Sequence, residues 1–135
     1  MIEEKPATHT IGIIVTHGEL ADELCHTTEL IVGKLSGCYA ISGSDFCDEE
    51  VIGRIKEIIA GAPDSRTIIF VDYFGGSCCI NSVRAVKGLK GVQVISGVNL
   101  PILLDFITKR DSIAFQDMVE HLINRGKESV RLIEF

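Results

Sequence analysis

Short runs of apolar residues recur along the chain, and helical patterns separate them. The runs Ile11–Val15 and Ile68–Val71 contain almost no polar position, which is typical of parallel strands covered on both faces. The runs Cys38–Ile41 and Val92–Ile95 predict two further strands. Val130–Phe135 is also strongly apolar, and it is predicted to be a last strand at an edge of the sheet.

Between these runs, apolar residues repeat every three or four positions, which is the spacing of an amphipathic helix. The first predicted helix is Glu19–Val32. The second runs through Val51 and Ile59, begins at Ser44, Asp45 or Asp48, and stops at 61–64. The third is N-capped by Ser77, the fourth runs from Pro101 to Arg110, and the fifth runs from Phe115 to Gly126. Strands that alternate with helices in this way indicate an α/β fold, an open parallel sheet with right-handed crossovers and helices on both faces. The short first strand-helix unit favours the flavodoxin-like strand order 2-1-3-4.

Composition narrows the class of protein. The chain has 135 residues, 46% of them hydrophobic, which is enough for one core, so we expect a single domain over 1–135. No apolar run approaches the roughly 20 residues of a membrane span, and the first residues lack the pattern of a signal peptide. We therefore expect a soluble, cytoplasmic protein. A net charge of −6 argues against nucleic-acid binding and favours proteins or small molecules as partners.

The five cysteines are Cys25, Cys38, Cys47, Cys78 and Cys79. Their odd number and unpaired spacing suggest neither a disulfide framework nor a zinc site of the C-x-x-C type, so we expect no metal. Cys25 and Cys38 are predicted to be small core residues, which is the usual role of a free cysteine.

Polar side chains follow the two predicted strands that contain almost no polar position. His17 lies just beyond Ile11–Val15, and Asp72 comes directly after Ile68–Val71. In the order 2-1-3-4 these strands are neighbours, and ligands bind in the crevice beyond their carboxyl ends. A carboxylate that accepts the Nδ1 proton of an imidazole leaves Nε2 as a nucleophile, so this pair would prepare His17 to accept a phosphoryl group.

Gly75, Gly76 and Ser77 follow Asp72 at the expected start of a helix. Backbone N–H groups that converge at such a place attract anions, phosphate especially. Turn chemistry alone is the alternative explanation, because many strand-to-helix turns contain glycine and serine for their geometry.

The chain resembles the mannose-type IIA domains of the bacterial phosphoenolpyruvate-dependent sugar phosphotransferase system. Three separated segments carry the resemblance, which spans nearly the whole chain: Ile13–Gly18, Val71–Ser77 and Ile95–Pro101. It implies that His17 accepts a phosphoryl group at Nε2 from the phosphocarrier protein HPr. It also implies that His17 passes this group to a histidine of a IIB domain, which serves a membrane IIC/IID complex in sugar uptake.

The resemblance further implies that Asp72 orients His17 and that the phosphate lies near Gly18, Gly75, Gly76 and Ser77, with no cofactor. It implies a homodimer in which the last strand, Val130–Phe135 here, is exchanged between subunits. Two positions depart from the family pattern, since Cys78 stands where the family usually has proline and an asparagine is displaced to Asn81.

A rival interpretation is a cysteine phosphatase, because Cys78 and Arg84 have the C-x5-R spacing of those enzymes. However, the apolar spacing after Ser77 predicts a helix, and six residues along a helix place the two side chains roughly 240° apart, too divergent to share one phosphate. A redox site remains as an alternative, with the Cys78 thiol at a helix N-terminus and its pKa lowered.

Two binding modules are the remaining alternatives. A flavin is not expected, because the loop after the first strand is only Thr16–Gly18 and the chain has no tryptophan. A regulatory module of an incomplete phosphotransferase system would use the same His17 and differ only in its recipient. The other histidines, His9, His26 and His121, are expected to be solvated or structurally satisfied, since none follows a strand.

Overall fold

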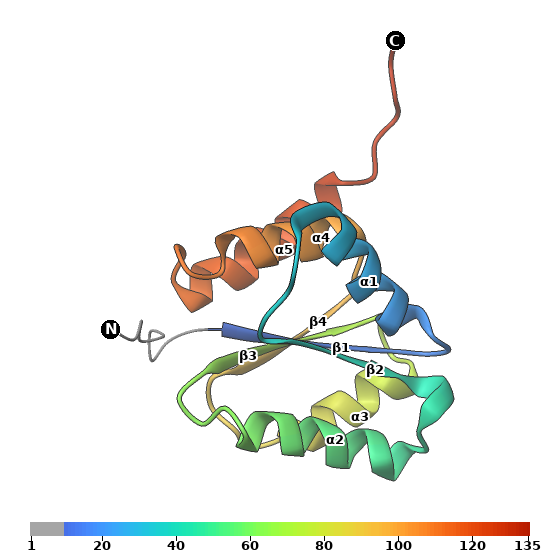
Figure 1. The fold of residues 1–135 in the computed structure, drawn as a ribbon, viewed down its shortest axis with the longest axis vertical. Coiled ribbons are helices and arrows are strands. Elements are labelled where there is room, and N and C mark those ends of the chain that lie inside the picture. The colour runs from blue at the N-terminus through green and yellow to red at the C-terminus, as the bar shows by residue number, and fades with distance from the viewer. Residues whose placement is uncertain (1–9) are drawn as a thin grey trace.

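A parallel sheet lies between two layers of helices in the computed structural model, which describes residues 10–135 (Figure 1). The strands of this part are β1 (Thr10–Thr16), β2 (Cys38–Ser42), β3 (Arg66–Val71) and β4 (Val92–Ser96). Their order is β2-β1-β3-β4, and all neighbouring pairs are parallel. The predicted flavodoxin-like order 2-1-3-4 is therefore confirmed.

Helices cover both faces of the sheet. The helical segments between residues 10 and 135 are α1 (Leu20–Val32), the 3₁₀ turn η1 (Gly43–Asp45), α2 (Asp48–Ala60), α3 (Ser77–Val86), α4 (Leu100–Lys109) and α5 (Phe115–Glu128). Figure 1 shows α2 and α3 on one face and α1, α4 and α5 on the other. None of these helices is long and apolar enough to cross a membrane.

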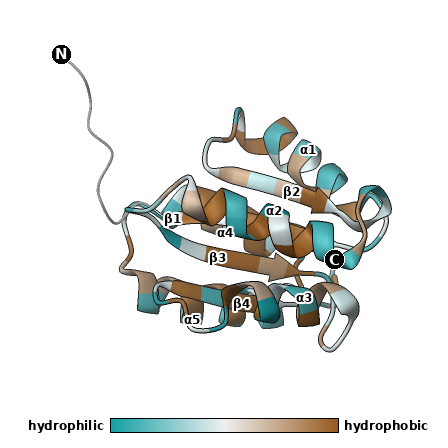
Figure 2. Ribbon diagram, turned by 90° about the horizontal axis from the view of Figure 1, so that it is seen from below, coloured by the Kyte–Doolittle hydropathy of each residue, from teal (hydrophilic) through white to brown (hydrophobic). Residues whose placement is uncertain are grey.

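The two central strands are buried on both faces, which is why their sequences lack a polar side. Every residue of β1 is buried, and Figure 2 shows the strands as largely hydrophobic. Ile13 packs into the core beneath α2 and α3, whereas its neighbour Ile14 packs into the core beneath α1, α4 and α5. In the second core, Phe70 of β3 meets Phe106 of α4 edge to face, with ring centroids 5.2 Å apart.

The starts of the second and third predicted helices are close to the structure, but other residues cap them. Helix α2 begins at Asp48, one of the three predicted starting residues, and Cys47 caps it. Glu50 accepts a hydrogen bond from Cys47 N at 2.9 Å and completes a capping box. Helix α3 is capped by Gly76, and Ser77 is its first residue. The Ser77 hydroxyl turns toward His17 instead of capping the helix.

The fourth and fifth helices fit the predictions in part. Asn99 caps α4, since its Oδ1 accepts from Ile102 N at 3.0 Å, and Pro101 lies in the first turn as predicted. Helix α5 does not end at Gly126 but continues to Glu128. Gly126 serves close packing there, because a Cβ at this position would lie 2.7 Å from Ile102 Cδ1.

Val130–Phe135 forms no strand within residues 10–135, so the predicted last strand is wrong for the single chain. Figure 1 shows the segment leaving α5 and pointing away from the sheet. The side chains of Val130, Leu132, Ile133 and Phe135 are 78% exposed or more. In the described part of the chain β4 pairs only with β3, so its outer edge is open.

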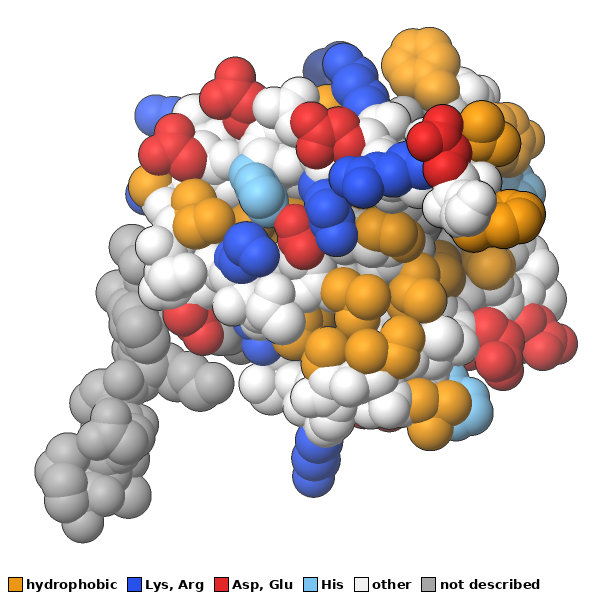
Figure 3. Space-filling model, turned by 90° about the horizontal axis from the view of Figure 1, so that it is seen from above, with side chains coloured by type: hydrophobic (Ala, Val, Ile, Leu, Met, Phe, Trp, Pro, Cys, Tyr) orange, Lys and Arg blue, Asp and Glu red, His pale blue; other side chains and the backbone are white. Residues whose placement is uncertain are grey.

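The face made by α1, α4 and α5 is mixed in character. Figure 3 shows hydrophobic side chains gathered there beside lysine, arginine and acidic side chains. Leu30 and Ile31 of α1 are among the exposed apolar residues of the chain, at 73% and 55%. Beneath this face, the nearly buried Arg110 guanidinium donates to the carbonyls of Thr10, Ser36 and Gly37, and so closes the amino end of the sheet.

Candidate functional site

The loop after β1 places His17 at the carboxyl edge of the sheet. Thr16 Oγ1 accepts a hydrogen bond from Ala21 N at 2.7 Å, which starts α1 almost directly after the strand. Gly18 completes the short turn with φ at 56°, a value that favours glycine. The His17 side chain is therefore held at a fixed point of the edge, with 45% of its surface exposed.

Asp72 reaches His17 from the end of β3. Its Oδ2 accepts hydrogen bonds from both His17 N and His17 Nδ1, each at 2.8 Å, and its Oδ1 accepts from Tyr73 N at 3.0 Å. Because a carboxylate can only accept, Nδ1 carries the imidazole proton and Nε2 keeps its lone pair. The structure thus brings together the two residues that the sequence placed on neighbouring strands.

The same hydrogen bonds control the charge of Asp72. Partial burial acts to raise the pKa of this carboxyl, but the donors at His17 and Tyr73 and the His17 ring outweigh it, and the pKa lies below its ordinary value of 3.8. Asp72 is therefore ionised throughout the neutral range and stabilises positive charge on the imidazole.

The N-terminus of α3 lies on the other side of the ring. Ser77 Oγ is 3.0 Å from His17 Nε2, and with Nδ1 protonated the hydroxyl donates to Nε2. Gly75 has φ at 87°, and a Cβ on Gly76 would lie 2.6 Å from the Tyr73 ring, so both positions favour glycine. The first N–H groups of a helix have no acceptor within it, so they are suited to bind an anion next to Nε2.

Cys78 also contacts the histidine, with its Sγ 3.6 Å from Nδ1. Burial, then the charges of Asp72 and Asp48, raise the pKa of this thiol to about 11. The expectation of a lowered pKa at the start of α3 is therefore wrong, because the acidic neighbours and burial outweigh the helix N-terminus.

Sequence reasoning missed the contribution of the segment that follows β2. A small hollow of about 160 Å³ opens beside the histidine and is lined by His17, Gly18, Gly43, Ser44, Phe46, Asp48, Val51, Ser77, Cys78 and Asn81. Gly43 makes room for the His17 loop, since a Cβ there would lie 2.9 Å from Thr16 O. The displaced Asn81 donates to Asp48 Oδ1 at 3.0 Å and so orders this wall. The position of Gly43 directly after a strand was the available signal.

Tyr73 is a second residue that the sequence did not single out. Its ring stacks on His17 with centroids 5.3 Å apart and planes at 27°. The aromatic face shields one side of the imidazole and leaves Nε2 directed toward Ser77.

The rival phosphatase geometry does not form. Both Cys78 and Arg84 lie within α3, and they face different hollows, since Arg84 lines one with Lys56 and Lys87. No single phosphate is enclosed by the two side chains.

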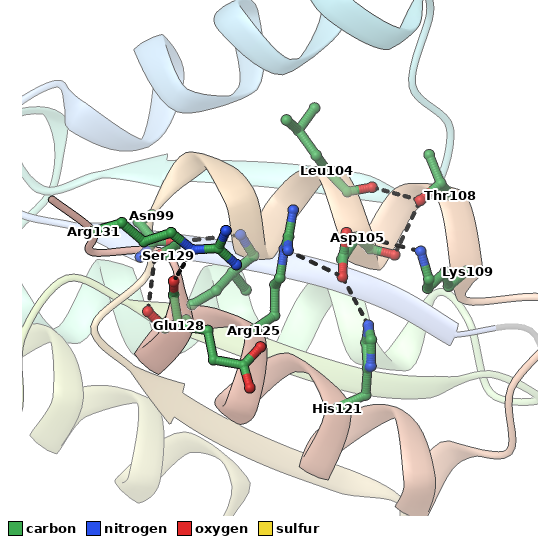
Figure 4. A network of polar contacts seen from close by, with 12 residues as sticks. Asn99, Leu104, Asp105, Thr108, Lys109, His121, Arg125, Glu128, Ser129 and Arg131 are labelled. Atoms are coloured by element: carbon green, nitrogen blue, oxygen red, sulfur yellow. Dashed lines mark hydrogen bonds and ion pairs between the residues drawn. The ribbon is translucent and has the colours of Figure 1, made fainter. Parts of the chain in front are cut away.

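The other histidines of residues 10–135, His26 and His121, lie away from this site. Figure 4 shows His121 of α5 paired with Asp105 of α4, their Nε2 and Oδ2 atoms 2.7 Å apart, with Arg125 and Lys109 near the same carboxylate. His26 lies 3.7 Å from Glu23 on the exposed side of α1. His9 falls outside the described residues.

The fold and site together define an α/β domain with a histidine at the carboxyl edge of a flavodoxin-like sheet, paired through Nδ1 with a carboxylate and unprotonated at Nε2. Residues 12–123 match the family model EIIA-man, described as the PTS system fructose IIA component. The chain belongs to this family of phosphotransferase system components. The resemblance noted in the sequence is thereby confirmed.

Individual relatives agree with this assignment. The chain is 29% identical over 132 residues to the PTS system mannose-specific EIIAB component of Escherichia coli K12, covering 93% of this chain but only 40% of that protein. It is 25% identical to the PTS system fructose-specific EIIA component of Bacillus subtilis, covering 90% of this chain and 86% of that protein. The chain thus spans less than half the length of the E. coli relative.

Solved structures share the fold. A phosphotransferase system component EIIA from Streptococcus agalactiae superposes with a TM-score of 0.83 at 21% identity, covering 90% of this chain and 95% of that one. A mannose/sorbose-specific IIA subunit from Enterococcus faecalis gives a TM-score of 0.80 at 21% identity, covering 95% and 97%.

Proposed function

We propose that this protein carries a phosphoryl group on His17 Nε2, accepts it from HPr and passes it to a histidine of a IIB domain during sugar uptake. The observation that carries the proposal is the 2.8 Å contact between His17 Nδ1 and Asp72 Oδ2, which leaves Nε2 unprotonated at the N-terminus of α3, where its lone pair accepts a hydrogen bond from Ser77 Oγ. Family membership supports the same chemistry.

The transfer is a displacement at phosphorus. The Nε2 lone pair of His17 forms a bond to the phosphorus of phosphorylated HPr, and the bond from phosphorus to the HPr histidine breaks. As Nε2 becomes bonded, the ring gains positive charge, and Asp72 stabilises it through Nδ1–H. Gly18 and the first amides of α3, with Gly75, Gly76 and Ser77, receive the phosphate oxygens. The IIB histidine then attacks in the same way and releases Nε2.

The proposal is tested by incubation with phosphoenolpyruvate, enzyme I and HPr, followed by location of the modified residue. We expect one acid-labile phosphoryl group on His17. The His17→Ala protein should remain unlabelled, whereas His121→Ala, which changes a histidine far from the site, should be labelled as the wild type is. Normal labelling of His17→Ala would falsify the proposal.

The recipient distinguishes transport from regulation. The phosphorylated protein should transfer its phosphoryl group to a histidine of a mannose-type IIB domain. Labelling of His17 without transfer to any IIB domain would instead favour the regulatory module of an incomplete system.

We also propose that the protein is a homodimer that exchanges residues 130–135. A groove of about 570 Å³ runs along the open edge of β4, and Val94, Val83 and Ile123 are among the residues that line it. The exposed apolar side chains of Val130, Leu132, Ile133 and Phe135 have the character to fill it from a second copy, with backbone pairing along β4. The family resemblance supports this arrangement.

A further inference from the structure

Three different metal-ligating groups converge beside His17. His17 Nδ1, Asp72 Oδ2 and Cys78 Sγ all lie within 4.8 Å of one another. They come from the loop after β1, the end of β3 and the first turn of α3, so no spacing in the sequence reveals them. An imidazole, a carboxylate and a thiol form a ligand set that zinc binds in proteins.

Two of the three distances between the ligand atoms are close to those around one tetrahedral ion. Two ligands held tetrahedrally by zinc, a nitrogen and a sulfur, lie about 3.6 Å apart. The observed distance between His17 Nδ1 and Cys78 Sγ is 3.6 Å. The distance between Nδ1 and Asp72 Oδ2 is 2.8 Å, and it would open by about half an ångström to admit the ion. The hollow beside His17 leaves a fourth position for water.

The surrounding charge favours a cation. Cys78 is 96% buried yet has two acidic neighbours, Asp72 and Asp48, whose charges oppose a bare thiolate. A divalent ion at this place reverses that repulsion, because it neutralises the thiolate and the carboxylate together.

We propose that His17, Asp72 and Cys78 form a Zn²⁺ site that switches His17 off as a phosphoryl acceptor. The ion takes the place of the proton on Nδ1, the thiol proton of Cys78 leaves to solvent, and the imidazole proton moves to Nε2. Nε2 then donates to Ser77 Oγ and has no lone pair for phosphorus. The regulatory part of this proposal rests on the proposed function of His17, whereas the metal site itself does not.

Cobalt(II) is the probe for the site, because a thiolate ligand produces a charge-transfer band in the near ultraviolet. The wild-type protein should bind one equivalent with this band. Cys79→Ala, which removes the neighbouring thiol, should keep it. Cys78→Ala should lose the band and bind the ion about 100-fold more weakly or worse. A wild-type protein without the band, or an unchanged band in Cys78→Ala, overturns the site.

The switch is tested with purified phosphorylated HPr in the absence of magnesium, with and without one equivalent of Zn²⁺. Labelling of the wild type should fall in proportion to the metal-bound fraction and recover when the ion is chelated. The ratio of rates with and without zinc should be near one in Cys78→Ala. Full labelling of the zinc-loaded wild type overturns the switch, whereas failure to label without metal overturns the proposed function and leaves the cobalt result to decide the site.

Discussion

The two ring nitrogens of His17 differ in protonation, and Asp72 determines which one is protonated. Nδ1 carries the proton and donates a hydrogen bond to Asp72, whereas Nε2 keeps its lone pair. Changing Asp72 to Asn keeps the size of the side chain but removes the charge and the obligatory acceptor at Nδ1. We expect phosphoryl transfer to slow by about 100-fold or more while the protein stays folded. Rapid-quench labelling measures the rate, and a wild-type rate in Asp72→Asn would contradict the orienting role.

The lowered pKa of Asp72 also has a consequence for stability. A carboxyl whose pKa is lower in the folded than in the unfolded state stabilises the fold above its ordinary pKa, and this contribution disappears as the pH falls through the lowered value. The difference in unfolding free energy between wild type and Asp72→Asn should therefore shrink below about pH 3.8. Urea unfolding of both proteins along a pH series measures it, and a constant difference would contradict the pairing.

Ser77 has a weaker role, because its hydroxyl makes a single hydrogen bond to Nε2. In the phosphorylated protein the same hydroxyl can rotate to donate to a phosphate oxygen. Ser77→Ala should lose about 1 kcal/mol of this stabilisation, so the phosphoryl group should hydrolyse about fivefold faster. Hydrolysis of the purified phosphoprotein measures the effect. Ser77→Thr, which keeps a hydroxyl, should retain most of the stability.

Among the elements, the segment after β2 lines the site and supports the His17 loop by packing. Gly43→Ala places a Cβ 2.9 Å from Thr16 O, a backbone atom that cannot turn aside. We expect a loss of about 1–3 kcal/mol of stability and slower labelling of His17. Gly53→Ala is the matched control, since its Cβ meets open space within α2, and it should stabilise by about 0.5–1 kcal/mol. Thermal unfolding of both variants measures the contrast.

At this scale the sequence predicts most of the fold. The strands are predictable from apolar runs such as Ile11–Val15, because a strand that is covered on both faces has apolar residues at nearly every position. The order of the strands follows from the way in which they alternate with helices. Helix caps were less predictable than helix positions. Cys47 caps α2 only because the Glu50 side chain folds back to accept a hydrogen bond from its backbone N–H. Gly126 reads as a stop signal, yet it lies within α5 because Ile102 of another helix needs the space.

The candidate site also has parts that the sequence predicts and parts that it does not. His17 and Asp72 were predictable because each follows a strand, and the topology alone brings the two strand ends together. The contact between Cys78 and His17 was not, because it depends on the rotation of α3 around its axis. The stacking of Tyr73 depends on how the loop after β3 turns, which the residue order leaves open.

At the scale of the whole molecule, the proposed exchange makes assembly depend on six residues. Removal of 130–135 leaves Ser129 in place, with its Oγ accepting from Asn99 Nδ2 at 3.1 Å, so α5 should keep its end (Figure 4). We expect the shortened protein to be a monomer or to aggregate through the bare edge of β4. Sedimentation at micromolar concentration measures this, and an intact protein that sediments as a monomer would exclude the exchange.

The contacts of Arg110 should make local opening of the sheet differ between its two ends. Its guanidinium joins the start of β1 to the residues that lead into β2, and it lies over the ring of Phe106 at 5.5 Å. The amino end of the sheet is therefore fixed by these hydrogen bonds, whereas the carboxyl end is held by the loops that form the proposed phosphorylation site. In a hydrogen-exchange experiment, deuterium should enter the backbone amides of the sheet first at the His17 end. Amides at the two ends of the same strand should therefore exchange at different rates.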